Sequence, residues 1–377
     1  MRTIKLKLEV DSETFKPTLE AYTDAFNYVC QTAWDNQEFN GVSLHHLTYH
    51  QVRNDTGLKS QLAISARVKA TEALASTQVS KKKGKKVSCP KNKCSTIRYD
   101  DRSLTVDFAN RTINILTLKG RVRLPIFVPK HFEQYLTWKR CSADLFQVKG
   151  KTFLHIVFEK ETEDVEPSGK MIGIDRGIRK LATVSDNRFY GGGRIKRLSE
   201  RYERLRSALQ SKGTRSAKRH LAKISRSERL MRKDINHCIA KQIVKDLEKG
   251  TTIVLEKLTG IRGGATKFRK PQRKEVNKWN FFQFEQFLTY KAMAKGCQVV
   301  YVDARYTSQR CSKCGHIHKG NRQNQSNFKC RKCGFQLNAD LNASKNIVLK
   351  YLDATGYPDW ATVNLPNGGL TTANVSA

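Results

Sequence analysis

Four cysteines in two closely spaced pairs are the feature that most restricts how this chain can fold. Cys311 and Cys314 form the first pair, and Cys330 and Cys333 form the second. Two intervening residues let both sulfur atoms of a pair reach one ion in a tight turn, and two such pairs complete a tetrahedron around Zn²⁺. Because four protein ligands leave no open coordination position, we expect a structural zinc site.

The remaining cysteines and the first residues of the chain indicate its compartment. The chain contains ten cysteines. Met1–Lys7 alternates charged and apolar residues, which is unlike a secretion signal. Unpaired thiols of this kind persist in a reducing compartment. No stretch approaches the roughly 18 apolar residues that a membrane helix needs. We therefore expect a cytoplasmic protein without a membrane partner, associated with the nucleoid.

The charge balance predicts a polyanionic partner. Lys and Arg number 70 and Asp and Glu number 34, so the formal charge is 70 − 34 = +36. Residues 194–233 contain 15 Lys or Arg against three Glu. Such a run can be a solvated helix face, but this excess favours phosphate contacts. The candidate nucleic-acid-binding residues, in these helices and in the basic loop 260–274, are Arg201, Arg204, Arg215, Lys218, Arg219, Lys223, Lys267, Arg269 and Lys270.

Three acidic residues form a candidate catalytic set. Asp175 and Glu256 each end a short apolar run that is typical of a buried strand, and Asp340 stands at the start of a predicted helix. One such acid alone is more often a cap or a turn former. Carboxylates that face each other repel unless a cation neutralises them, and two Mg²⁺ ions could do so while holding a phosphate.

The periodicity divides the chain into two halves. Residues 1–15 and 100–165 contain short alternating runs that predict a small antiparallel barrel or sandwich. Residues 16–99 have helical apolar spacing and read as an insertion into it. The acidic segment 161–169 predicts a linker.

The second half begins with three short strands in series. We expect an α/β domain over 170–304 and 336–353, interrupted by the cysteine module at 305–335. The tail 354–377 is polar with little periodicity and is expected to be disordered.

Four motifs in the second half resemble one known family. They lie at Gly173–Gly177, Leu255–Leu258, Tyr306–Gly315 and Asn338–Ile347. The chain resembles TnpB, the RNA-guided nuclease of insertion-sequence transposons and a relative of compact type V CRISPR effectors. The motifs cover about 170–350 and are highly specific as a set, whereas the N-terminal half matches in layout only.

The resemblance implies a fold and an activity. The fold would be an α/β RNase H-like (RuvC) nuclease domain with an inserted zinc ribbon, plus an N-terminal wedge β-barrel with a helical recognition insertion. Asp175, Glu256 and Asp340 would be the catalytic triad that binds two Mg²⁺ ions. The partners would be a guide RNA from the transposon end and a double-stranded DNA target beside a short protein-read motif. Cleavage would leave 5′ phosphates.

One departure and three alternatives remain. Asn338 stands where many relatives carry an acid, but that acid is outside the triad. The chain could be a nuclease-inactive RNA-guided repressor, but such a protein would not need the intact triad that this chain has. A transposase acting without RNA could share the fold. A plain RNA-binding zinc-ribbon protein would explain the charge and the cysteines but not the three acids.

Overall fold

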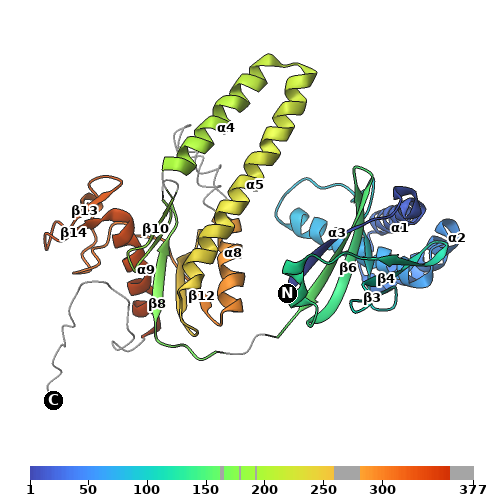
Figure 1. Ribbon diagram of the computed structural model, residues 1–377, viewed down its shortest axis with the longest axis horizontal. Helices are drawn as coiled ribbons and strands as arrows, with labels where there is room; N and C mark the ends of the chain where they lie inside the picture. Colours follow the sequence, from blue (N-terminus) through green and yellow to red (C-terminus); the bar gives the residue numbers. More distant parts are fainter. Residues whose placement is uncertain (162–164, 178–179, 192, 259–280, 357–377) are drawn as a thin grey trace. The chain divides into compact units, whose positions relative to one another are not determined.

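The protein consists of two compact units (Figure 1). The computed structural model describes residues 1–161, 165–177, 180–191, 193–258 and 281–356. Unit 1 is Met1–Glu161 and unit 2 is Thr162–Ala377. The boundary falls at the start of the acidic segment in which we predicted a linker. Each unit is considered by itself.

Unit 1 contains seven strands in two antiparallel sheets. The first sheet has the order β1-β7-β6-β2 and the second has the order β3-β4-β5. The strands are β1 (Arg2–Leu8), β2 (Ile97–Tyr99), β3 (Leu104–Asp107), β4 (Thr112–Thr117), β5 (Gly120–Pro125), β6 (Lys139–Val148) and β7 (Lys151–Glu159). Two open sheets over one hydrophobic core correspond to the sandwich alternative and not to a closed barrel.

Three helices are inserted between β1 and β2. They are α1 (Lys16–Asp35), α2 (Gly41–Thr56) and α3 (Ser60–Lys82), and their buried faces join the same core as both sheets. The expected helical range 16–99 was wrong at its end, because Ile97–Tyr99 is a strand that pairs antiparallel with β6. Ile97 and Tyr99 of this strand are buried in the core, and Arg98 between them is only partly buried.

Unit 2 is built on a five-stranded mixed sheet. Its strand order is β10-β9-β8-β11-β12. Strand β8 pairs antiparallel with β9 and parallel with β11, which in turn pairs parallel with β12. The strands are β8 (Met171–Asp175), β9 (Lys180–Val184), β10 (Phe189–Gly191), β11 (Thr252–Glu256) and β12 (Gln298–Val302).

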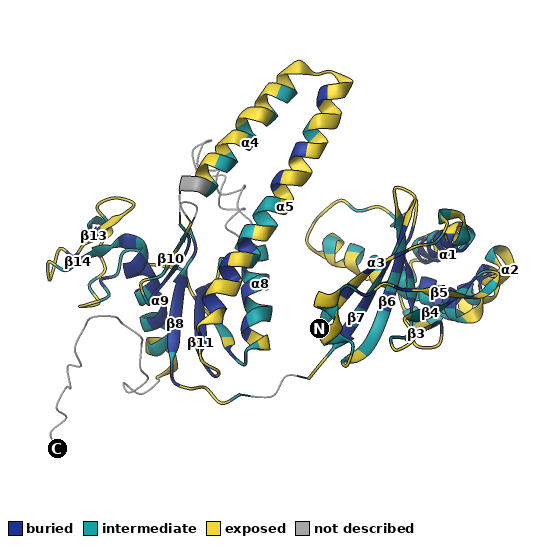
Figure 2. Cartoon of the chain, viewed as in Figure 1, coloured by how far each residue is buried: buried dark blue, intermediate teal, exposed yellow. Residues whose placement is uncertain are grey.

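Helices cover both faces of this sheet. Alternate residues of the central strands, such as Ile172, Ile174 and Leu255, pack against α5 (Arg215–Lys245) and α8 (Phe281–Ala294). The opposite alternation packs against α9 (Ala339–Thr355). Figures 1 and 2 show the buried strands between α9 and the α5–α8 pair.

Helix α9 lies unusually close to β8. A Cβ atom at Gly173 would stand 2.1 Å from the Ser344 carbonyl oxygen and 2.9 Å from Cγ2 of Val348. Only a residue without a side chain allows this approach. The helix begins where Asn338 accepts hydrogen bonds from the N–H groups of Asp340 and Leu341. It runs to Thr355, two residues beyond the predicted end of the α/β domain at 353. The predicted disordered tail falls mainly on 357–377, outside the described residues.

The basic segment forms a helical hairpin of α4 (Gly193–Lys212) and α5. Gly213 adopts a φ of 62° at the turn, and Thr214 caps α5 by accepting from the Ala217 N–H. Farther along, the buried Glu228 of α5 pairs with Arg206 of α4 and with Arg232. Figure 2 shows that the outer part of the hairpin is mostly exposed.

We expect Gly173→Ala to destabilise unit 2 by roughly 1 to 3 kcal/mol or more, because overpacking forces α9 away from β8. Urea unfolding would measure the change. Gly41→Ala is the matched control, since its Cβ would meet only the flexible end of Arg67 at 3.1 Å and a methyl group of Thr71 at 3.8 Å. Equal stability of the two variants would contradict the close approach.

Candidate active site and metal centre

Three acidic side chains from three elements converge at one end of the unit 2 sheet. Asp175 ends β8 and Glu256 ends its parallel neighbour β11. By the alternation of each strand, both residues lie on the α9 face. Asp340 belongs to the first turn of α9 on the same face. The structure therefore brings together the three acids that the sequence singled out.

Burial shifts the pKa values of Asp175 and Glu256 upward. Burial and the negative charges of Glu256 and Asp340 raise the pKa of Asp175 to about 7. Burial also raises the pKa of Glu256, against hydrogen bonding from Thr307 and the positive charge of Arg176. Carboxylates with raised pKa values in one cluster are typical of sites that need a cation or a proton.

A guanidinium group from the cysteine module reaches this cluster. Arg322 Nη2 donates to Asp340 Oδ1 at 3.2 Å and to the Gln325 carbonyl oxygen at 3.2 Å. Its charge lowers the pKa of both Asp175 and Glu256 against the larger effect of burial. Sequence reasoning missed this residue because it belongs to a polar loop whose spacing says nothing of the acids.

Two further residues hold the acid-bearing strands. The buried guanidinium of Arg176 bonds Glu285 at 2.6 Å through Nη1, and its Nη2 donates to the main-chain oxygen of Glu256. Thr307 donates its hydroxyl to the Glu256 carboxylate. Arg176 could have been noticed from its place directly after Asp175, whereas Thr307 carries no such signal.

Buried asparagines of α9 attach this helix to the chain that leaves the sheet. Asn346 Nδ2 donates to the Thr307 carbonyl at 2.9 Å and to the Arg310 carbonyl at 2.6 Å. Asn342 also donates to the Arg310 carbonyl, at 2.8 Å, and accepts from the Ser312 N–H at 3.0 Å. The segment that carries Thr307 is thereby fixed to the helix that carries Asp340.

The donor chemistry of the three acids suits Mg²⁺, which prefers carboxylate oxygens. Their oxygens are farther apart than those of a compact metal cluster, because among the described residues only the cysteines form a group whose ligand atoms all lie within 4.8 Å. Instead, Asp340 is held by Arg322 and Glu256 by Thr307. The pKa of Asp175 is raised because its negative charge is buried beside two other carboxylates. A bound cation would relieve this unfavourable charge.

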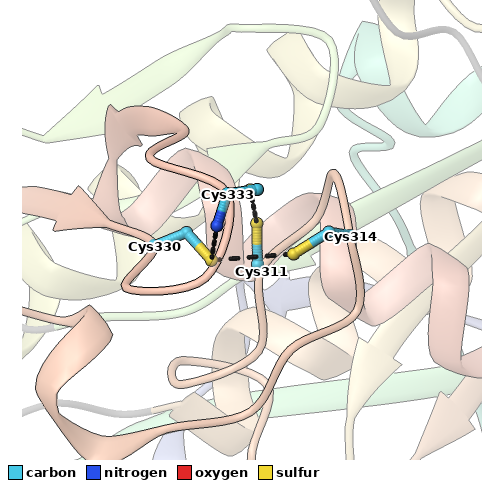
Figure 3. Close-up of side chains that lie close together, drawn as sticks. All are labelled: Cys311, Cys314, Cys330 and Cys333. Carbon is cyan, nitrogen blue, oxygen red and sulfur yellow. Dashed lines mark hydrogen bonds between the residues drawn. The ribbon is translucent and has the colours of Figure 1, made fainter.

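The four predicted cysteines form one cluster (Figure 3). Their sulfur atoms lie 3.8 Å apart for Cys311 and Cys333 and 3.6 Å apart for Cys314 and Cys330. A Zn–S bond of about 2.3 Å puts two sulfur atoms of a tetrahedron about 3.8 Å apart. The cluster thus has the dimensions of a zinc site.

Backbone turns set the positions of the sulfur atoms. The Cys311 N–H donates to the His316 oxygen at 3.0 Å, and the Cys330 N–H donates to the Phe335 oxygen at 2.8 Å. Each turn closes through a glycine with positive φ, 72° at Gly315 and 68° at Gly334. Strands β13 (Asn327–Lys329) and β14 (Gln336–Asn338) pair beside the cluster, and β14 leads directly into α9.

Most of the candidate phosphate-binding residues are accessible on the hairpin. Those of α4 and α5 are all exposed: Arg201, Arg204, Arg215, Lys218, Arg219 and Lys223. The other three, Lys267, Arg269 and Lys270, lie outside the described residues. Within the described chain, no helix is both long and apolar enough to cross a membrane.

Two family models match unit 2, and one of them begins a few residues earlier, at the end of unit 1. Residues 155–260 match a family described as a probable transposase, OrfB_IS605. Residues 281–347 match the Cas12f1-like TNB domain. The first match contains Asp175 and Glu256, and the second contains the cysteine cluster and Asp340.

Curated relatives cover the same part of the chain. Cas12f1, a CRISPR-associated endodeoxyribonuclease of Sulfoacidibacillus thermotolerans, is 33% identical over 54% of this chain and 51% of its own length. InsQ, a putative RNA-guided DNA endonuclease of Escherichia coli K12, is 31% identical over 55% and 56%. A TnpB-like protein of Aquifex aeolicus is 30% identical over 56% of this chain and 78% of its own length. The chain spans about half the length of the first two.

Solved structures share the fold at low sequence identity. A Cas12f1–sgRNA–target DNA complex has a TM-score of 0.59 at 14% identity, covering 89% of this chain and 82% of that one. The mini RNA-guided endonuclease CRISPR-Cas_phi3 also has a TM-score of 0.59, at 11% identity, covering 98% and 93%. The fold is therefore that of compact Cas12 effectors.

We expect freshly purified protein to contain one Zn²⁺ per chain. Cys311→Ser should lower the zinc content and destabilise unit 2, because metal binding and folding are coupled. Cys238→Ser is the matched control, since Cys238 is an exposed cysteine outside the cluster. Elemental analysis would decide, and zinc-free protein, or full zinc in Cys311→Ser, would contradict the assignment.

We expect Asp175→Asn to stabilise the Mg²⁺-free protein at pH 8, by on the order of 1 to 3 kcal/mol. The pKa of Asp175 is raised in the folded protein to about 7, so folding favours its protonated form. The stability that this proton provides is complete below pH 4 and is lost as the pH rises through 7. Urea unfolding without added Mg²⁺, and without a chelator that would remove zinc, should therefore give a large difference at pH 8 and almost none at pH 4. A destabilised variant at pH 8 would contradict the raised pKa of Asp175.

Proposed function

The chain belongs to the TnpB family, and on this premise we propose that it is an RNA-guided endonuclease that cuts DNA. The relatives from Sulfoacidibacillus and Escherichia carry endonuclease names, the second of them explicitly RNA-guided. The observation that carries the proposal is the convergence of Asp175, Glu256 and Asp340 at one sheet end, where burial and mutual repulsion raise the pKa of Asp175. A purely RNA-binding protein has no use for such a cluster.

We assign unit 2 to the RuvC-like, RNase H type. Three antiparallel strands followed by two parallel strands in one sheet support this assignment, as do helices on both faces. The cysteine module at 305–335 would then be its inserted zinc ribbon. Unit 1 would serve as the wedge and recognition part, which in this chain consists of two sheets and three helices.

The three acids would hold Mg²⁺. When bound, a pair of these ions would supply an activated water and stabilise the leaving 3′ oxygen, which would leave 5′-phosphate ends. The protein's own residues orient this chemistry: Thr307 fixes the Glu256 carboxylate, and Arg176 fixes the main chain at Glu256. Arg322 brings a guanidinium to the same place, which suits a phosphate oxygen of the strand.

Guide RNA would supply the sequence specificity. In such systems pairing reads the target, while the protein holds the heteroduplex by its backbone and reads a short adjacent motif. This requires charge without base specificity, which the net charge of +36 and the exposed hairpin residues provide. We further propose that the guide derives from a transposon end and that the target is DNA of the nucleoid.

Two alternatives have weaker support. A repressor without nuclease activity would tolerate loss of the acids, but all three are present and clustered. A transposase acting without RNA could use the same fold, but the names of the relatives favour RNA guidance. A requirement for RNA and for Mg²⁺ in cleavage separates these functions.

Asp175→Ala should reduce cleavage of a matched target at least about 1,000-fold, while RNA-guided DNA binding stays within a few-fold of wild type. The carboxylate is proposed to hold metal and not nucleic acid. Cleavage and binding would be measured on the same preparation, with saturating Mg²⁺. Glu256→Gln and Asp340→Asn should act alike and should not add to Asp175→Ala, because residues that act as a unit are not additive. Cutting at the wild-type rate would refute the site.

Replacing Arg215, Lys218, Arg219 and Lys223 together by Ala should weaken RNA binding across all sequences and flatten its salt dependence. Each phosphate contact contributes about 0.7 to the log–log slope for a single strand and about 0.9 for duplex DNA. The control exchanges Arg and Lys at the same four positions, which keeps the charge. An unchanged slope would make the hairpin a solvated surface, and a sequence-selective loss would mean that these residues read bases.

A further inference from the structure

A small hollow with aromatic walls lies at the same end of the sheet as the three acids. Its volume is about 380 Å³. We call it the aromatic pocket, and its lining residues are Lys257, Leu258, Phe281, Phe282, Glu285 and Tyr301. Small-molecule sites in proteins span roughly 300 to 1,000 Å³, so this one suits a single flat ring system.

Helix geometry explains why aromatic rings remain accessible here. Phe284 and Leu288, four residues apart, carry α8 onto the core, and both are buried. Phe282 lies on the opposite side of the helix and is 69% exposed, while Tyr301 of β12 is 43% exposed. The helical spacing of the aromatic residues in 281–290 predicts that they belong to the core. That expectation holds for Phe284, but Phe282 is an exception without a structural reason of its own.

Two residues of the pocket lining are connected to residues that carry or neighbour the acids. Lys257 follows Glu256 directly in the chain, and its N–H donates to the Val302 oxygen at 2.8 Å. Glu285 binds the guanidinium of Arg176, the residue that follows Asp175. The pocket lies on the α8 face of this sheet end, because Tyr301 pairs with Leu255, whereas the acids lie on the α9 face. A strand that crosses the ends of β11 and β12 from the acids toward α8 would bring a nearby nucleotide to the pocket.

We propose that the aromatic pocket binds one nucleobase of single-stranded DNA, next to the phosphate that is cut. This inference rests on the proposed function and adds a subsite to it. The base stacks on the exposed ring of Phe282, with Tyr301 as a second aromatic wall. Aromatic side chains bind bases of single strands in this way, largely without regard to sequence.

The charges of the lining favour a nucleotide over an apolar peptide. The negative charge of Glu285 is offset by Arg176 at 2.6 Å, which leaves Lys257 as the net charge of the rim. A cation beside aromatic rings matches the base and phosphate of one nucleotide. Since stacking requires an unpaired base, the pocket would select a displaced strand over duplex DNA.

The test combines Phe282→Ala with abasic substitutions in the target strands. Wild-type protein with its guide RNA should cut a target roughly 5- to 100-fold more slowly when one particular nucleotide beside the cut lacks its base, because stacking of a base is lost. Phe282→Ala should show the same slow rate with the intact strand and no further loss with the abasic one. Phe282→Trp should restore the dependence.

Met293→Ala is the matched control, because Met293 is an exposed apolar residue of α8 outside the pocket. It should cut like wild type and keep the abasic dependence. The inference is overturned if Phe282→Ala cuts at the wild-type rate. It is also overturned if Phe282→Ala is slower than wild type by the same factor on the intact strand and on the abasic strand, as a purely structural role of Phe282 would require. Occupation of the pocket by the chain's own residues predicts the first of these results.

A binding measurement separates this inference from the proposed function. A single-stranded oligonucleotide containing 2-aminopurine, whose fluorescence falls on stacking, is added to Asp175→Ala protein with and without Phe282→Ala. Quenching that depends on Phe282 supports the pocket even if wild-type protein fails to cut any target, an outcome that would sink only the proposed function. Quenching that is equal in both proteins overturns the pocket.

Discussion

Burial of three like-charged carboxylates at one end of a sheet is the constraint on which the rest of unit 2 depends. Asp175, Glu256 and Asp340 come from two parallel strands and a helix, and burial together with the charges of Glu256 and Asp340 raises the pKa of Asp175 to about 7. Such an arrangement costs stability in the absence of a cation. Packing and capping of the neighbouring helix offset this cost. Helix α9 packs directly on Gly173, and Asn338 caps the helix that carries Asp340.

The cysteine module takes part in the same construction. It begins beside Thr307, which holds the Glu256 carboxylate, and it carries Arg322, which holds Asp340. Asn342 and Asn346 of α9 bind the connecting segment through its backbone. Zinc at the four cysteines would therefore fix more than a local loop. It would set the position of one cationic and one hydroxyl partner of the acids, so loss of zinc should disturb the acidic cluster.

Much of unit 2 could be predicted from the sequence because its signals are local. Apolar runs that end in Asp175 and Glu256 indicate strands, and the cysteine spacing indicates one ion site whose dimensions the structure bears out. What could not be predicted depends on tertiary contacts. Arg322 is one of many basic residues until the module folds back on α9, and Phe282 belongs to a helical stripe until the fold leaves it exposed. The roles of the acids remain proposals.

Unit 1 was harder to predict for a related reason. Its strands were recognisable one by one, but whether they close into a barrel depends on pairings between distant segments. Ile97–Tyr99 is too short to signal a strand, yet it pairs with β6 and ends the helical insertion. Short strands acquire their identity from a partner and not from their own periodicity.

Redirection of cleavage by RNA tests the central claim most directly. The RNA that co-purifies with the protein would be sequenced, its guide segment replaced, and the reconstituted complex offered the old and the new DNA targets in Mg²⁺. The account predicts that cutting moves to the new target, disappears in EDTA and disappears with Asp175→Ala. Cutting that persists at the old target, or that continues after the RNA is removed, would contradict it.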